Sequence, residues 1–239
     1  FLHGNTVSLE LRTAVLGFAD TYKNAIKTKM NYESIDVVCD LPPQLKAPLM
    51  KEIFFPILSK HPMVASLIEL DHDFVNDLMR EAMIDRALPR GEMLFCTGSE
   101  ADEMYLAAPD PGKRSRDPVL RYRRDEVEVR ILGGQWICEA ALIIEGWRHR
   151  GDCEAAKRAE LISITSAGFR NVFATHMARG ATTAVFLCFY ALTFLHNIPT
   201  NIESALVRSD MWCDLEHAWS NARRAVEYAD HVREHPWTL

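Results

Sequence analysis

Closely spaced turn residues in the middle of the chain limit its possible folds more than any other feature of the sequence. Between residues 85 and 165, short apolar segments are separated by turn-forming groups at 89–91, 97–99, 109–112 and 133–134. Segments this short do not form ordinary helices, and turns at this frequency are typical of antiparallel sheets. The spacing therefore predicts a β domain, with strands at 92–96, 104–107, 119–123, 127–132, 152–155 and 161–164.

Apolar side chains at helical spacing flank this β domain on both sides. An amphipathic helix is predicted over 7–28, where such side chains recur at Leu11, Val15, Phe18, Tyr22 and Ile26. A second helical stretch is expected to kink at Pro56 and to end at His61-Pro62. Asp71 and Asp73 can cap a further helix, and the helical pattern returns after the β domain. The predicted fold class is α+β.

The composition is that of an ordinary globular protein and excludes several classes of function. The 239 residues carry 27 basic and 33 acidic side chains, for a net charge of −6, so a nucleic-acid partner is not expected. The six cysteines lie far apart, without a CxxC pair or a histidine at metal-ligand spacing, which predicts neither a disulfide framework nor a metal site and favours a reducing compartment. No catalytic signature is found, so no enzyme activity is assigned. The chain opens at Phe1 without a methionine, which we interpret as a fragment of a longer protein.

One long segment near the C-terminal end lacks charged residues. Residues 180–202 contain no Asp, Glu, Lys or Arg, and 12 of the 15 residues from 181 to 195 are apolar. A bilayer needs about 20 apolar residues, and threonines interrupt this run. We therefore expect a helix over 181–195 that is buried against the β domain or the N-terminal helices, with a membrane helix as the alternative.

The segment from Gly134 to Arg150 holds the candidate binding site. It contains a carboxylate followed by two small residues, Glu139, Ala140 and Ala141, and a basic cluster about ten residues later. Free backbone N–H groups at the start of a short helix and an arginine suit a cyclic phosphodiester, and Glu139 suits the hydroxyl of a ribose. The alternative for Glu139 is a structural role as the cap of that helix. His61, beside a helix end, is expected to be a surface or capping residue.

Two sets of motifs resemble known families. Three segments are similar in order and spacing to cyclic nucleotide-binding domains: Leu88-Pro-Arg-Gly-Glu-Met-Leu-Phe-Cys-Thr-Gly98, Glu103-Met-Tyr-Leu106 and 134–150. Upstream segments resemble the C-linker of voltage-gated channels, which joins the pore to such a domain: Ser8-Leu-Glu-Leu-Arg12, Ile35-Asp36, Leu41-Pro42-Pro43-Gln44-Leu45 and His61-Pro62-Met63-Val64. The resemblance implies a helical C-linker at 1–62, an antiparallel, jelly-roll-like β-roll at 63–176 and C-terminal helices at 177–239.

The resemblance also assigns the ligand-binding residues. They are Cys138, Glu139, Ala140 and Ala141, with the phosphate-binding position at Arg148, His149 or Arg150. Counting forward from Glu139 selects Arg148, counting backward from the strand at 161–164 selects His149, and Arg150 also stays open. Cys138 stands where the family has glycine, so a positive φ there would strain its backbone. We therefore predict that cAMP or cGMP binds weakly, if at all.

The function implied by the resemblance is that of a cytoplasmic regulatory module of a cation channel that is potassium-selective or weakly selective. Such a module lies on the cytoplasmic side of a membrane and either senses a cyclic nucleotide or acts in gating and assembly without a ligand. Its partners are other channel subunits, as a homotetramer, with contacts near Leu11, Phe18, Tyr22 and Tyr32. The alternative is a soluble cyclic-nucleotide-responsive regulator that resembles a kinase regulatory subunit. Beyond the nucleotide, no cofactor is expected.

Overall fold

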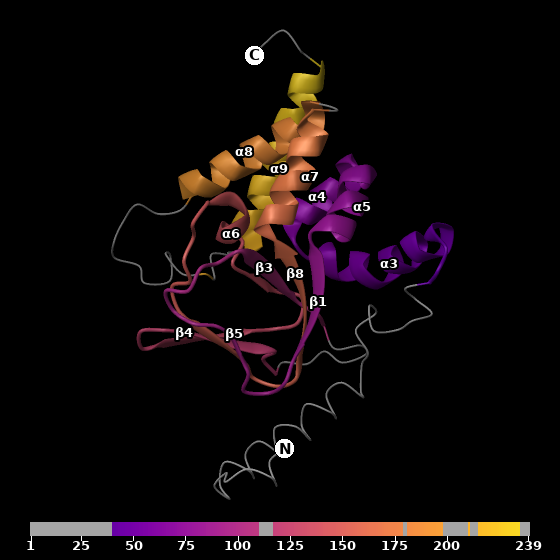
Figure 1. Ribbon diagram of the computed structural model, residues 1–239. Coiled ribbons are helices and arrows are strands. Elements are labelled where there is room, and N and C mark those ends of the chain that lie inside the picture. The colour runs from indigo at the N-terminus through magenta and orange to yellow at the C-terminus, as the bar shows by residue number, and fades with distance from the viewer. Residues whose placement is uncertain (1–39, 110–116, 179–180, 198–209, 211–214, 235–239) are drawn as a thin grey trace, which may run out of the picture.

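The computed structural model describes residues 40–109, 117–178, 181–197, 210 and 215–234 and combines helices with two antiparallel sheets (Figure 1). The described chain is therefore of the predicted α+β class. The predicted helix over 7–28 and its expected contact residues lie outside the described residues, so these predictions stay open.

The described helices stand on both sides of the strands in the sequence. The helices are α3 (Pro43–Leu58), α4 (Pro62–Leu70), α5 (His72–Glu81), the single-turn α6 (Ala140–Ile143), α7 (Ser166–Met177), α8 (Ala181–Asn197) and α9 (Leu215–Glu234). The strands are β1 (Met83–Leu88), β2 (Met93–Phe95), β3 (Glu103–Ala107), β4 (Leu120–Arg124), β5 (Val127–Ile131), β6 (Trp136–Ile137), β7 (Asp152–Ala155) and β8 (Ala159–Thr165). Figure 1 shows α4, α5, α7, α8 and α9 gathered at one end of the strands.

The eight described strands form two four-stranded sheets, which we call the double sheet. One has the order β1-β8-β3-β6 and the other β2-β7-β4-β5. Six of these strands confirm the sequence prediction, with ends that differ by at most two residues. The prediction missed β1 and β6. Only Ala82 separates β1 from α5, so no turn marks its start, and β6 has only two residues.

The alternation of side chains along β3 explains why the molecule has two apolar cores. Met104 and Leu106 face the helices and pack with α4, α5, α7, α8 and α9. Tyr105 and Ala107 face the other sheet and pack with residues of β4 and β7. Neighbouring residues of a strand point to opposite faces, so β3 is buried on both sides and lies between the cores.

The helices before the double sheet follow most of the predicted signals. Asp71 caps α5, because its carboxylate accepts a hydrogen bond of 2.9 Å from the N–H of Phe74. Helix α3 continues through Pro56 to Leu58, and Pro62 opens α4, the position at which proline is tolerated best. The expectation for His61 is wrong. It is fully buried between α3 and α4 and its side chain makes no cap hydrogen bond.

The apolar segment near the C-terminal end forms the predicted helix, α8 (Ala181–Asn197). Its inner face is buried at Phe186, Tyr190 and Phe194, against α9, α7 and α4. Its outer face is exposed at Leu192 and Leu195, so burial is limited to one side. None of the helices in the described part of the chain has the length and apolar character needed to span a membrane.

Candidate functional site

The segment between β6 and β7 carries the predicted site, and its first part is the single turn of α6. Ala140 and Ala141, the small residues predicted to let a ligand approach the backbone, are both buried by the protein itself. The N–H of Ala141 donates to the carbonyl of Cys138 at 3.0 Å, and the N–H of Leu142 donates to the carbonyl of Glu139 at 3.0 Å. These two N–H groups are therefore occupied by hydrogen bonds within the turn.

Glu139 lies inside the molecule, where it contacts three different elements. Its carboxylate accepts hydrogen bonds from the hydroxyl of Tyr190 on α8 (2.6 Å) and from the indole N–H of Trp136 on β6 (3.1 Å). Nε2 of His61 lies 3.4 Å from the same carboxylate. Glu139 stands at the N-cap position of α6, as the structural alternative expected, but its side chain makes no cap hydrogen bond there.

The surroundings of Glu139 favour its ionised form. Burial acts to raise the pKa of Glu139, but His61 and the hydrogen bonds from Tyr190 and Trp136 outweigh burial, so its pKa lies below the usual value. The carboxylate is therefore a charged, fully partnered link between the α3–α4 turn, the double sheet and α8. A ribose hydroxyl could reach it only by displacing one of these partners.

Cys138, which stands where the resembled family has glycine, has the positive φ that strains a residue with a side chain. Its φ is +68°, in the left-handed region, and its side chain is fully buried. A Cβ atom in this conformation costs about 1–2 kcal/mol. The strained cysteine thus lies just before α6, at a position where glycine would adopt the same φ without strain.

A residue that the sequence analysis did not assign to the site, Asp210, fills the space beside Cys138. Its carboxylate accepts hydrogen bonds from the backbone N–H of Arg150 (2.7 Å), the indole N–H of Trp147 (2.9 Å) and the hydroxyl of Tyr122 (3.1 Å). Its carbonyl accepts a 2.8 Å hydrogen bond from the N–H of Cys138. No local pattern marks Asp210, because it is 60 or more residues from all these partners in the sequence.

Asp210 is buried as a charged group. Burial acts to raise the pKa of Asp210, but the hydrogen bonds from His149, Trp147 and the Arg150 backbone lower it, so its pKa lies below the usual value. Donors from the 147–150 turn thus surround a carboxylate in the way that they would surround a phosphate oxygen.

Of the three basic side chains at the predicted phosphate position, His149 is the one that points inward. It is buried and stacks on Phe95, with ring centroids 3.7 Å apart. Its Nδ1 lies 3.6 Å from Sγ of Cys138 and 3.5 Å from Oδ1 of Asp210. Arg148 and Arg150 are exposed, where Arg148 donates to the carbonyl of Gly98 and Arg150 lies over the ring of Trp147.

This Cys, His and Asp set differs from a nucleophilic triad. In a triad the nucleophile and the carboxylate contact opposite nitrogens of the histidine, which lets the ring pass a proton. Here both Cys138 and Asp210 face the same nitrogen, Nδ1 of His149. The arrangement brings three potential ligand atoms together rather than aligning a proton relay.

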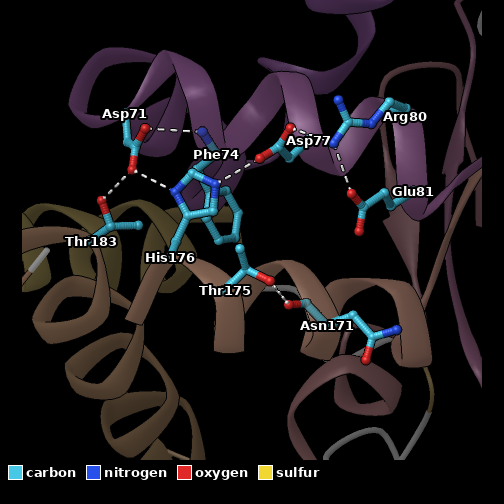
Figure 2. Close-up of polar contacts among 9 residues, drawn as sticks. All are labelled: Asp71, Phe74, Asp77, Arg80, Glu81, Asn171, Thr175, His176 and Thr183. Atoms are coloured by element: carbon cyan, nitrogen blue, oxygen red, sulfur yellow. Dashed lines mark hydrogen bonds and ion pairs between the residues drawn. The ribbon is translucent and has the colours of Figure 1, made fainter. Parts of the chain in front are cut away.

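Another buried histidine joins the helices near the double sheet (Figure 2). His176 on α7 lies between two carboxylates of the α5 region, with Nδ1 3.2 Å from Asp71 and Nε2 3.0 Å from Asp77. Thr183 on α8 donates to the same Asp71 oxygen at 2.9 Å. The cluster therefore ties α5, α7 and α8 together.

A scan against models of protein families finds no match, and a search of curated proteins finds none. The site is therefore interpreted from its own geometry.

Proposed function

We propose that the chain is a regulatory module of the cyclic nucleotide-binding type that works without a bound nucleotide, as part of a cation channel. In this proposal the double sheet is the jelly-roll-like β-roll, residues 134–150 are its former phosphate cassette, and residues 1–62 are the C-linker. The pair of four-stranded antiparallel sheets, followed by helices, is compatible with this assignment.

The observation that carries the proposal is the position of Asp210. A cyclic phosphate needs an anion site made of N–H donors, and here the donors of Trp147 and Arg150 already bond to the Asp210 carboxylate. A second anion would have to displace a buried, fully partnered carboxylate, which costs several kcal/mol. The chain's own residue thus takes the place that a nucleotide phosphate would require.

The partners of Glu139 support the same proposal. The carboxylate that the resemblance assigns to a ribose bonds instead to Tyr190 of α8 and lies beside His61 of the α3–α4 turn. A displacement of α8 would therefore alter the contact with the N-terminal helices. This connection from α8 through Glu139 to His61 suits a gating or assembly role. In such a role the helices before the double sheet act on the pore from the cytoplasmic side of the membrane.

Calorimetric titration with cAMP and cGMP tests the proposal. We expect a Kd weaker than about 1 mM for the wild type with either nucleotide. Asp210→Ala should bind at least as well as the wild type, because it frees the donors at 147–150. Asp230→Ala, which removes a surface carboxylate paired with Arg233, is the matched control and should leave binding unchanged. A submicromolar Kd for the wild type would contradict the proposal and favour the soluble, nucleotide-responsive regulator.

The state of assembly tests the channel part of the proposal. Light scattering over a concentration series should show a shift from monomers toward homotetramers, more so when the chain is fused to a channel pore. Strictly dimeric masses would contradict the channel assignment.

A further inference from the structure

Three potential metal ligands from distant parts of the chain converge on one point beside the double sheet. Cys138 follows β6, His149 precedes β7, and Asp210 comes after α8 in the sequence. All three are buried, and one ligand atom from each lies within 4.8 Å of the others. We infer that these residues bind a zinc ion, which fastens residue 210 to the double sheet. The inference stands without the proposed function, since it depends only on these three side chains.

Two of the three distances between the ligand atoms already suit tetrahedral zinc. A thiolate sulfur lies about 2.3 Å from Zn²⁺ and a nitrogen or oxygen about 2.0–2.1 Å, which places neighbouring ligand atoms about 3.3–3.6 Å apart. The sulfur of Cys138 is 3.6 Å from Nδ1 of His149, and this nitrogen is 3.5 Å from Oδ1 of Asp210. The sulfur of Cys138 and the carboxylate of Asp210 lie within 4.8 Å of each other, so these two ligands must approach by up to about 1.2 Å to close around an ion. A water molecule completes the tetrahedron.

The chemistry of the three groups selects zinc among the common divalent ions. A thiolate and a carboxylate together balance the charge of Zn²⁺, and the imidazole of His149 binds as a neutral ring. Binding forms a Zn–S bond and releases the thiol proton of Cys138 to solvent. Mg²⁺ and Ca²⁺ prefer oxygen ligands, which makes a sulfur and nitrogen site unsuitable for them.

Groups behind the ligands hold them in position, as a metal site requires. The N–H groups of Trp147 and Arg150 fix the carboxylate of Asp210. The ring of Phe95 lies nearly parallel to that of His149, with 6° between their planes, and fixes its orientation.

The strained backbone of Cys138 is an independent observation that points to a use for its side chain. Glycine would avoid the strain of a φ of +68° at this position. Strain of this kind is common where a side chain has a function that outweighs it. A thiolate ligand gives the cysteine such a function.

The test uses the full 239-residue chain, freed of metal with a chelator and titrated with Zn²⁺ or Co²⁺. We expect one equivalent of either ion to bind, with the near-ultraviolet thiolate-to-cobalt band of a Co–S bond. Cys138→Gly removes the thiol and relieves the backbone, so it should fold and bind Zn²⁺ at least about 100-fold more weakly. His149→Gln is a second variant that should show the same loss. Cys188→Ala, which removes an exposed thiol of α8, is the control and should bind like the wild type.

Protection of the thiol provides a second measurement. Zn²⁺ should slow the reaction of Cys138 with an alkylating reagent, measured by mass spectrometry of a digest, and leave the exposed Cys96 unaffected. A wild-type protein without the Co–S band would overturn the inference and leave only a hydrogen bond between Cys138 and His149. Unchanged Zn²⁺ affinity in both Cys138→Gly and His149→Gln would overturn it as well.

Discussion

Two buried histidines of this protein meet carboxylates in opposite ways. His176 contacts Asp71 and Asp77 through different ring nitrogens, so the imidazole lies between its partners and joins α7 to α5 (Figure 2). His149 contacts Asp210 and Cys138 through one and the same nitrogen. The first arrangement uses both nitrogens as bridges between helices. The second directs three atoms of different kinds toward a common point.

The difference separates a structural clamp, formed by His176, Asp71 and Asp77, from a binding site, formed by Cys138, His149 and Asp210. In the clamp each interaction joins two helices, and the partners of His176 are only partly buried, with about a fifth of each carboxylate side chain exposed. In the site all three residues are fully buried, and the carboxylate is held by donors of the 147–150 turn. Loss of the clamp should therefore change stability alone, whereas loss of the site should change what the protein binds.

The largest effect is expected for His176→Ala. The substitution leaves Asp71 and Asp77 close together without the ring between them and removes the contact of the ring with Phe74. We expect the free energy of unfolding to fall by about 2–4 kcal/mol, measured by urea denaturation. Thr175→Ala, at the exposed neighbouring position, should change it by less than about 0.5 kcal/mol. The loss should be the same with and without Zn²⁺, and a loss that depends on zinc would remove the distinction between the two histidines.

Acid is expected to weaken both regions. Burial acts to raise the pKa of Asp71, but the Phe74 N–H, Thr183 and His176 outweigh it, and its pKa lies below the usual value, as does that of Asp210. A carboxyl whose pKa is lower in the folded state than its unfolded value of about 3.9 stabilises the protein fully above that pH. This stability is lost as the pH falls through the folded-state value.

Urea denaturation between pH 7 and pH 2.5 measures this effect. The free energy of unfolding should begin to fall near pH 4, and Asp71→Asn should have a shallower dependence than the wild type. Stability that stays constant or rises over this range would show that the two carboxyls are not held in their ionised forms.

The smallest effect on stability is expected for Cys138→Gly in metal-free buffer. The variant relieves the strain of the positive φ but loses a small buried side chain and gains freedom in the unfolded chain, and these contributions nearly cancel. We expect a change within about 1 kcal/mol. Added Zn²⁺ should raise the melting temperature of the wild type but not that of the variant. A variant that zinc stabilises as much as the wild type would contradict the difference between the clamp and the site.

Local patterns predicted most of the fold and little of the site. The turn residues around 89–91 and 133–134 identified six strands, and the Asp71 cap and the left-handed backbone of Cys138 agree with expectation. These features depend on neighbouring residues, which a sequence displays directly. The burial of His61 was missed because it depends on Trp136, a ring from another part of the chain that lies 4.6 Å away.

Asp210 could not be found from the sequence for the same reason. It lies 60 residues from Arg150 and 88 from Tyr122, and no spacing rule connects a tail residue to a turn that is so distant. The prediction that the cysteines hold no metal used spacing along the chain, which does not detect groups that only folding brings together, and it stays open until the Zn²⁺ titration is done. The contacts of Arg148, His149 and Arg150 likewise depended on packing, so sequence counting left three alternatives.

The most direct test is whether the carboxylate of Asp210 lies against Tyr122 of the double sheet in solution. A double-mutant cycle of Asp210→Ala and Tyr122→Phe, measured by urea denaturation in metal-free buffer, isolates the 3.1 Å hydrogen bond between the two side chains. We predict a coupling energy of at least about 1 kcal/mol, as expected for a buried hydrogen bond to a charged group. A coupling energy of zero within error would contradict it, because both the occupied anion site and the zinc site require Asp210 at this position.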